Sequence, residues 1–168
     1  MQPGVREVDT GGSHDEPADP AWLYGRHAPE LIRFATALVG PDRARDVVAS
    51  AMARALFERQ GPALRNPRAY LFRAVYNESI SVQRQLARTV RLVTRLRTER
   101  PPDPGIADAD DRVTSAIAGL SPRQRAVIVL TYWQDLEPAD VATHLGISEG
   151  SVRKHLARAR QNLRKVLS

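Results

Sequence analysis

The spacing of apolar residues along the chain predicts helices from residue 20 almost to its end. Apolar positions recur at steps of three and four over residues 22–39 and again over residues 42–58, and a Gly-Pro pair follows close after each stretch. Residues at this spacing share one face of a helix, so each stretch predicts a helix with one buried face. The expected core positions are Leu23, Leu31, Phe34, Leu38, Ala44, Val47, Val48, Ala51 and Ala55.

A third helix is expected to begin at Pro67, with Asn66 as its N-cap, and to run to about Arg97. Its expected apolar face holds Leu71, Ala74, Val75, Val82, Leu86, Val93 and Leu96. The opposite side of the helical wheel is a narrow basic band that holds Arg73, Asn77, Arg84, Arg88, Arg91 and Arg95, with Tyr70 at its edge.

This basic band favours contact with nucleic acid over simple exposure to solvent. Exposed helix faces usually alternate Glu with Arg for support between neighbouring turns, but the sole acid between residues 68 and 97 is Glu78, near the apolar side. An unbroken row of Arg with an Asn and an aromatic residue is typical of a groove that follows a nucleic-acid backbone and reads one base.

Residues 99–111 contain three Pro and four Asp and predict a stiff, acidic linker. A second helical unit follows it over residues 112–168. Its start contains the sequence Ser121-Pro-Arg-Gln124, a capping box with proline at the first helical position. Residues 1–19, rich in Gly, Pro and acids, are expected to form a disordered tail.

The last part of the chain has the order of a helix-turn-helix. Residues 138–145 predict a short helix, Gly146 fits a left-handed residue that ends it, and Ser148 is a good N-cap for a longer helix. In this motif the second helix lies in the major groove with its first turns at the base edges. The polar side of these turns holds Ser151, Arg153, Lys154 and Arg158. An ordinary core helix with a solvated basic face is the plainer alternative.

The expected fold class is therefore all-α, with two small helical domains, residues 20–98 and 112–168, each with a modest core of its own. The formal charge of +6 favours a polyanionic partner. The absence of Cys excludes disulfides, thiolate zinc sites and cysteine nucleophiles, and the four His have no metal-ligand spacing. No cofactor, no catalytic residue and no membrane span are expected, and residues 1–19 lack a signal-peptide pattern, so the expected location is the cytoplasm.

The order of these features resembles that of an RNA polymerase sigma factor of the extracytoplasmic-function class. The resemblance covers residues 20–168. The segment NPRAYLFRAVYN, residues 66–77, is similar to the family's promoter-melting and minus-ten segment. The segment LSPRQRAVIVLTYWQDL, residues 120–136, is similar to the entry of its C-terminal domain, and the last helix to its minus-thirty-five reading helix.

The resemblance implies roles for individual residues. Asn77 matches the residue that helps to capture an unstacked minus-ten base, Tyr70 an aromatic position, and Arg73 and Arg84 basic positions; Arg88 joins them from the basic band. Ser151, Arg153, Lys154, His155 and Arg158 match positions that meet phosphates or bases. Residues 45–56 match the helix that docks on the polymerase clamp, with Asp46, Ala49, Met52, Arg54 and Leu56 as contacts. At Ala49, Ser50 and Met52 the family usually has Gln, Glu and Phe.

The resemblance implies a transcription initiation factor whose partners are core RNA polymerase and promoter DNA; an anti-sigma factor as a further partner is left open. The alternative is a helix-turn-helix regulator that binds DNA without being a polymerase subunit, against which the Arg and Asn band of the first domain counts. A nuclease would need clustered carboxylates or an oriented His, and the one cluster of Asp lies in the linker.

Overall fold

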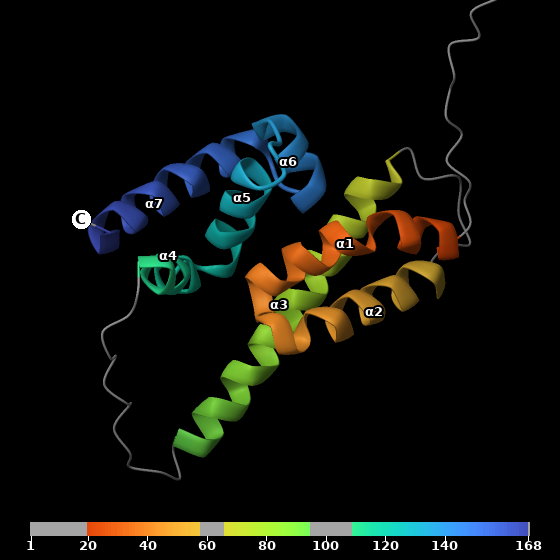
Figure 1. Ribbon diagram of the computed structural model, residues 1–168, viewed down its shortest axis with the longest axis horizontal. Coiled ribbons are helices and arrows are strands. Elements are labelled where there is room, and N and C mark those ends of the chain that lie inside the picture. Colours follow the sequence, from red (N-terminus) through yellow and green to blue (C-terminus); the bar gives the residue numbers. More distant parts are fainter. Residues whose placement is uncertain (1–19, 58–65, 95–108, 168) are drawn as a thin grey trace, which may run out of the picture.

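The computed structural model describes residues 20–57, 66–94 and 109–167, and all regular elements in these ranges are α-helices. The all-α prediction is thereby confirmed. The helices are α1 (Pro20–Val39), α2 (Pro41–Phe57), α3 (Pro67–Thr94), α4 (Ala109–Ala118), α5 (Pro122–Tyr132), α6 (Pro138–Leu145) and α7 (Glu149–Leu167). Figure 1 shows α4 to α7, the C-terminal half, gathered on one side of α1 to α3, the N-terminal half. The expected tail and most of the linker lie outside the described residues.

The N-terminal half is a bundle of three helices that pack on one another. Its core contains the predicted positions Leu31, Phe34, Leu38, Ala44, Val47, Val48, Ala51 and Ala55, all buried. The side chain of Leu23 lies outside the described part. Gly40, with a φ of 85°, separates α1 from α2 in a conformation that other residues avoid, and this turn lets the two helices fold back on each other.

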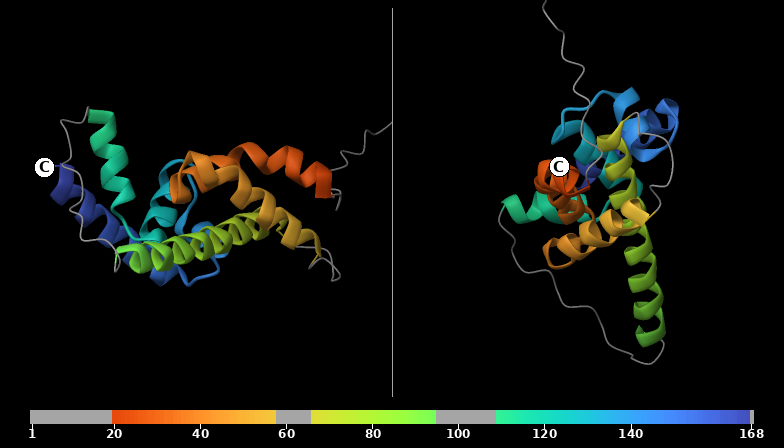
Figure 2. Two further views of the ribbon diagram at one scale, coloured as in Figure 1. Left: turned by 90° about the horizontal axis from the view of Figure 1, so that it is seen from below. Right: turned by 90° about the vertical axis from the view of Figure 1, so that its right-hand side faces the viewer.

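Helix α3 begins as the sequence predicts, because the side-chain oxygen of Asn66 accepts a 2.9 Å hydrogen bond from the backbone nitrogen of Ala69. Its first half buries Phe72 and Val75 completely. From Arg84 to Arg91 all side chains are exposed, and Leu86, expected in the core, is 36% exposed. The right-hand view of Figure 2 shows the reason: this end of α3 reaches past the other helices.

The local signals of the C-terminal half are also confirmed. Ser121 and Gln124 form the predicted reciprocal capping box, and Gly146 is left-handed with a φ of 64°. The hydroxyl of Ser148 accepts a hydrogen bond of 3.2 Å from the backbone nitrogen of Ser151 and so caps α7. The predicted linker boundary is too late, because residues 109–111 already belong to α4. Two of these three residues are Asp, which the partial positive charge of a helix N-terminus stabilises.

The two halves share one core instead of having a core each. Helix α1 contacts α5, helix α3 contacts α6, and the buried apolar residues of all these helices form a single cluster. Arg125 of α5 bridges the junction, because its guanidinium donates to the carbonyl oxygen of Leu38 in α1 at 2.9 Å. Within its own half it also donates to the carbonyl oxygens of Ile117 and Leu120, both at 3.1 Å. The side chains that the sequence assigned to DNA and to polymerase therefore sit on one packed body.

Candidate nucleic-acid interface

Five members of the predicted basic band are exposed along one side of α3: Arg73, Asn77, Arg84, Arg88 and Arg91. Tyr70, at the band's edge, is half-buried against the core. The one acid of this region, Glu78, forms an ion pair of 2.9 Å with Arg54 of α2. Among the described residues neither Arg84 nor Arg88 has an acidic partner, so the positive charge of this surface remains available to phosphates.

Asn77, Arg84 and Arg88 line a polar pocket of about 680 Å³. Arg54 forms part of its wall, and so does Arg123, which comes from α5 in the other half. The sequence did not single out Arg123, which looked like the second helical residue of a capping box. The nitrogen Nε of Arg123 donates to the hydroxyl of Tyr76 at 3.3 Å, and this contact holds α5 beside the pocket.

The second surface is the N-terminal part of α7. Val152, Leu156 and Ala159 are buried and fix the helix against its neighbours, so the opposite side faces outward. Arg153, Lys154 and Arg158 are exposed on it, and Ser151 is half-buried. Arg153 is paired with Glu149, one turn earlier in the helix. Lys154 and Arg158 lie one turn apart, close enough for adjacent phosphate and base contacts.

His155 differs from its basic neighbours in charge. Burial lowers its pKa below the ordinary value, and the positive charges of Arg123, Arg158 and Lys154 lower it further. The imidazole is therefore neutral at neutral pH. It offers one donor and one acceptor, where an Arg would offer a permanent cation.

The helix assigned to polymerase docking, α2, presents only some of its predicted contacts. Asp46, Ala49 and Arg54 are exposed, whereas Met52 is 6% exposed and belongs to the core. Met52 follows Val48 by four residues, so it falls on the buried side of the helix. Leu56 lies near the end of α2, and its side chain is outside the described part. The outward side of α2 is thus defined by Asp46, Ala49, Ser50 and Arg54.

Groups suited to metal binding or covalent chemistry are not gathered in the described ranges. No cluster of three or more His, Asp or Glu with the geometry to hold a metal ion occurs there. His27 and His144 are both buried by helix packing. None of the helices that the structure describes has the length and apolar character needed to cross a lipid bilayer.

A helix-turn-helix packed on a three-helix bundle, each with its own exposed basic surface, is the arrangement expected of a DNA-binding protein. The family model described as sigma-70, region 4, matches residues 110–163, which hold nearly all of α4, all of α5 and α6, and most of α7. The ECF RNA polymerase sigma factor SigL of Mycobacterium tuberculosis is 35% identical over 167 residues, which cover 94% of each chain. An RNA polymerase sigma-E factor of Streptomyces antibioticus is 32% identical over 82% of this chain and 78% of its own length.

Solved structures agree with these relatives. A chain in the co-crystal structure of the sigma factor RpoE with the anti-sigma factor NepR from Bartonella quintana superposes with a TM-score of 0.64 at 27% identity, over 86% of this chain and 93% of that one. A chain in the structure of CnrH with the cytosolic domain of CnrY gives a TM-score of 0.61 at 26% identity, over 88% and 86%. The chain therefore belongs to the extracytoplasmic-function family of RNA polymerase sigma factors, as its motifs indicated.

Proposed function

We propose that this protein is a transcription initiation factor that binds core RNA polymerase and directs it to specific promoters. The main support for this proposal is the 35% sequence identity to a sigma factor over 94% of both chains. The two exposed basic surfaces fit this role, because a promoter presents two separate elements. A regulator that acts without polymerase is not favoured, since these relatives are sigma factors along nearly the whole chain. The proposed role needs no covalent chemistry and places the protein with the chromosome in the cytoplasm.

The proposed role of α7 is to read the upstream element in the major groove. Arg153, Lys154 and Arg158 project from the side of α7 that faces away from the buried stripe. An Arg can pair with both acceptors of a guanine, and a lost contact of this kind weakens binding by about 1–3 kcal/mol. Ser151 and His155 are half-buried on α7 and would contact the DNA edge as uncharged groups.

The proposed role of α3 is to hold one strand of the melted minus-ten region. Its exposed Arg side chains follow the helix for several turns and suit a run of phosphates. Asn77 lies in the same polar pocket as Arg84 and Arg88, so a base turned out of the stack would meet its amide there. Tyr70 is half-buried at the band's edge, in reach of a stacking role.

The proposed polymerase contact is the outward side of α2. Asp46, Ala49 and Arg54 present their side chains there, with Met52 supporting the helix from the core. One of the two similar solved structures is of a complex with an anti-sigma factor, and the other is of a complex with the cytosolic domain of CnrY. We propose that this chain also has an anti-sigma partner. It would be sought by co-purification of the free factor and then tested for competition with core polymerase.

The test is transcription in vitro with core polymerase on fragmented genomic DNA, followed by footprinting at a mapped promoter. Arg153→Ala, Lys154→Ala and Arg158→Ala should each reduce upstream protection, while protection near the start site persists. Lys165→Ala is the matched control, because it removes the same charge from the far end of α7. A factor that yields no start sites above core polymerase alone contradicts the proposed function. Unchanged upstream protection in all three variants removes α7 from its proposed role.

A further inference from the structure

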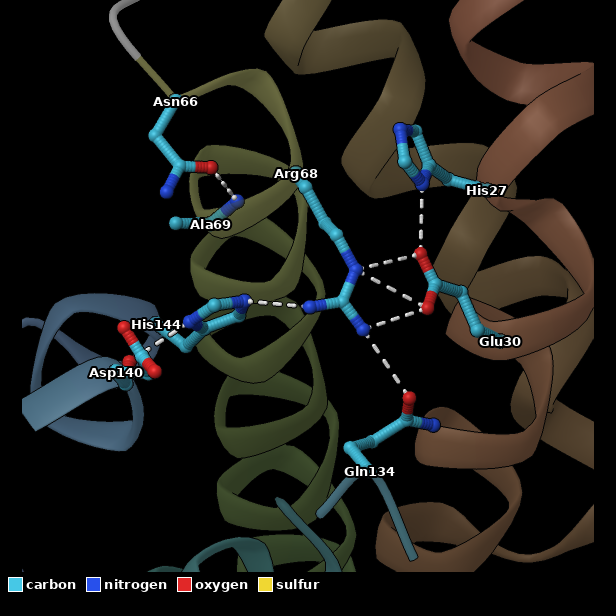
Figure 3. A network of polar contacts seen from close by, with 8 residues as sticks. All are labelled: His27, Glu30, Asn66, Arg68, Ala69, Gln134, Asp140 and His144. Atoms are coloured by element: carbon cyan, nitrogen blue, oxygen red, sulfur yellow. Dashed lines mark hydrogen bonds and ion pairs between the residues drawn. The ribbon is translucent and has the colours of Figure 1, made fainter. Parts of the chain in front are cut away.

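The junction between the two halves contains a polar cluster centred on Arg68 of α3. Its guanidinium forms two hydrogen bonds of 3.1 and 2.8 Å with the two carboxylate oxygens of Glu30 in α1. On its other side it reaches the C-terminal half, with Oε1 of Gln134 at 3.2 Å and Nε2 of His144 at 3.3 Å (Figure 3). We call Glu30, Arg68, Gln134 and His144 the Arg68 cluster. Arg68, which is ion-paired with Glu30 in the N-terminal half, thus also donates hydrogen bonds to Gln134 and His144 in the C-terminal half.

The geometry fixes the protonation of His144. Its Nδ1 lies 2.7 Å from the carbonyl oxygen of Asp140, which can only accept, so Nδ1 carries a proton. In the neutral ring Nε2 is then a free acceptor, as the hydrogen bond from Arg68 requires. The ring is 4% exposed and meets the ring of Phe72 edge-on at 5.2 Å. The cluster is satisfied only while His144 is uncharged.

The same junction engages residues assigned to promoter DNA. Arg73 donates a hydrogen bond of 2.8 Å to the carbonyl oxygen of Thr143 in α6. Its guanidinium also lies against the helix-turn-helix turn, where a Cβ on Gly146 would stand 2.9 Å from Nε of Arg73. Close by, Arg123 of the C-terminal half forms part of the wall of the pocket that holds Asn77. Two of the residues proposed to hold the minus-ten strand therefore face the other half of the protein.

From these contacts we infer that the Arg68 cluster is a latch that holds the two halves closed, and that closure competes with promoter DNA for Arg73 and the Asn77 pocket. The free factor is closed, and the halves separate when it engages polymerase and promoter. A strand that follows the basic band needs the guanidinium of Arg73, which cannot serve Thr143 at the same time. The competition rests on the proposed function, whereas the closed state of the free protein does not.

Acid should weaken the latch. Burial lowers the pKa of His144, and the positive charge of Arg68 adds to this effect against the raising influence of Asp140 and Glu30. Two further ionisable groups lie at this junction: His27 of α1, which contacts Glu30, and Arg73 of α3, which contacts Thr143. A His with a depressed pKa stabilises the closed state fully above its ordinary pKa of 6.5. This stabilisation is lost as the pH falls from there through the lower pKa of the closed state.

The test measures the separation of the halves by energy transfer between two dyes. The chain has no Cys, so the dyes are attached to the exposed positions Ala53→Cys on α2 and Asn162→Cys on α7. Gln134→Lys places a cation against Arg68 and should open the protein, lowering transfer. Ala139→Lys adds the same charge at an exposed position of α6 and should leave transfer as in the wild type. Circular dichroism checks that both variants keep their helices.

A second variant tests the latch without disturbing it at neutral pH. His144→Gln keeps an acceptor near the position of Nε2 but does not titrate. Transfer in the wild type should be constant above pH 6.5 and fall as the pH drops below it, and transfer in His144→Gln should stay constant. Equal transfer in the wild type and Gln134→Lys at neutral pH, or equal acid responses in the wild type and His144→Gln, would overturn the latch.

Assembly with core polymerase separates this inference from the proposed function. If both hold, Gln134→Lys should assemble about fivefold faster than the wild type or more, a typical size for coupling between two sites. If Gln134→Lys opens but neither protein binds core polymerase, the latch stands and the proposed function fails. If both proteins assemble at the same rate with the same transfer, the proposed function stands and the latch fails.

Discussion

Replacing Arg125 by Met should destabilise the protein far more than the same change at Arg123, two residues earlier in α5. Arg125 is half-buried and donates to four carbonyl oxygens, those of Leu38, Ile117, Ala118 and Leu120. Arg123 is exposed and donates once, to a hydroxyl. Met keeps most of the apolar stem in both variants, so the difference isolates the guanidinium bonds.

The expected magnitude follows from these bonds. A hydrogen bond to a charged group contributes about 1.5–3 kcal/mol net. Four such bonds would give an upper limit, but Ala118 is exposed and water replaces Arg125 at carbonyls near the surface. The loss for Arg125→Met should therefore equal about two such bonds at the low end of the range, or about 3 kcal/mol. For Arg123→Met it should stay below about 1 kcal/mol.

Urea unfolding followed by circular dichroism measures both values. With a denaturant dependence of about 2 kcal/mol per molar urea, Arg125→Met should lower the midpoint by about 1.5 M. The midpoint of Arg123→Met should fall by less than about 0.5 M. Similar midpoint shifts for the two variants would refute the reasoning. They would show that the hydrogen bonds from Arg125 to the carbonyl oxygens contribute no more to the free energy of unfolding than the single hydrogen bond of Arg123.

Three further changes test local features. Gly146→Ala should destabilise by about 1–2 kcal/mol through its left-handed φ, and this loss should persist in an Arg73→Ala background, where the close contact is gone; thermal unfolding measures both. Ser121→Ala should cost about 1 kcal/mol through the lost capping box, measured in the same way. Burial raises the pKa of Glu30, but bonds and charge from Arg68 and His27 outweigh it, so the pKa is lowered. The stabilisation is full above pH 4.5 and is lost as the pH falls below it, so the urea midpoint of the wild type should drop more steeply there than that of Glu30→Gln.

Features decided within a few residues could be predicted from the sequence. The cap at Asn66, the capping box at Ser121 and the left-handed Gly146 each depend on a side chain and backbone less than five residues away. Such features can therefore be predicted from a short stretch of neighbouring residues. The exposed basic side of α3 was predictable for the same reason, because helical periodicity alone separates it from the apolar side.

Contacts between distant parts of the chain could not be predicted in this way. Arg68 and His144 are separated by 76 positions, and the first looked like one Arg among many and the second like an isolated His. The shared core also left no local sign, since the apolar stripe of each half could equally have been covered within that half. Family resemblance alone predicted that Met52 contacts polymerase. Met52 lies one helical turn after the buried Val48, however, and its side chain is in the core.

The exposed end of α3 has a consequence for amide exchange. From Arg84 to Arg91 this helix has no buried side chain, so its backbone bonds are protected only by the helix's own propensity. A short unsupported helical end is marginal in water and frays within microseconds or faster. Amides here should exchange with solvent far sooner than those near Phe72, at which the same helix is anchored. A bound polyanion would order this end of α3, so part of the favourable binding free energy would be offset by the entropy lost on ordering. Ala87→Gly should therefore weaken binding, because Gly destabilises the helix, even though it removes no contact with the ligand.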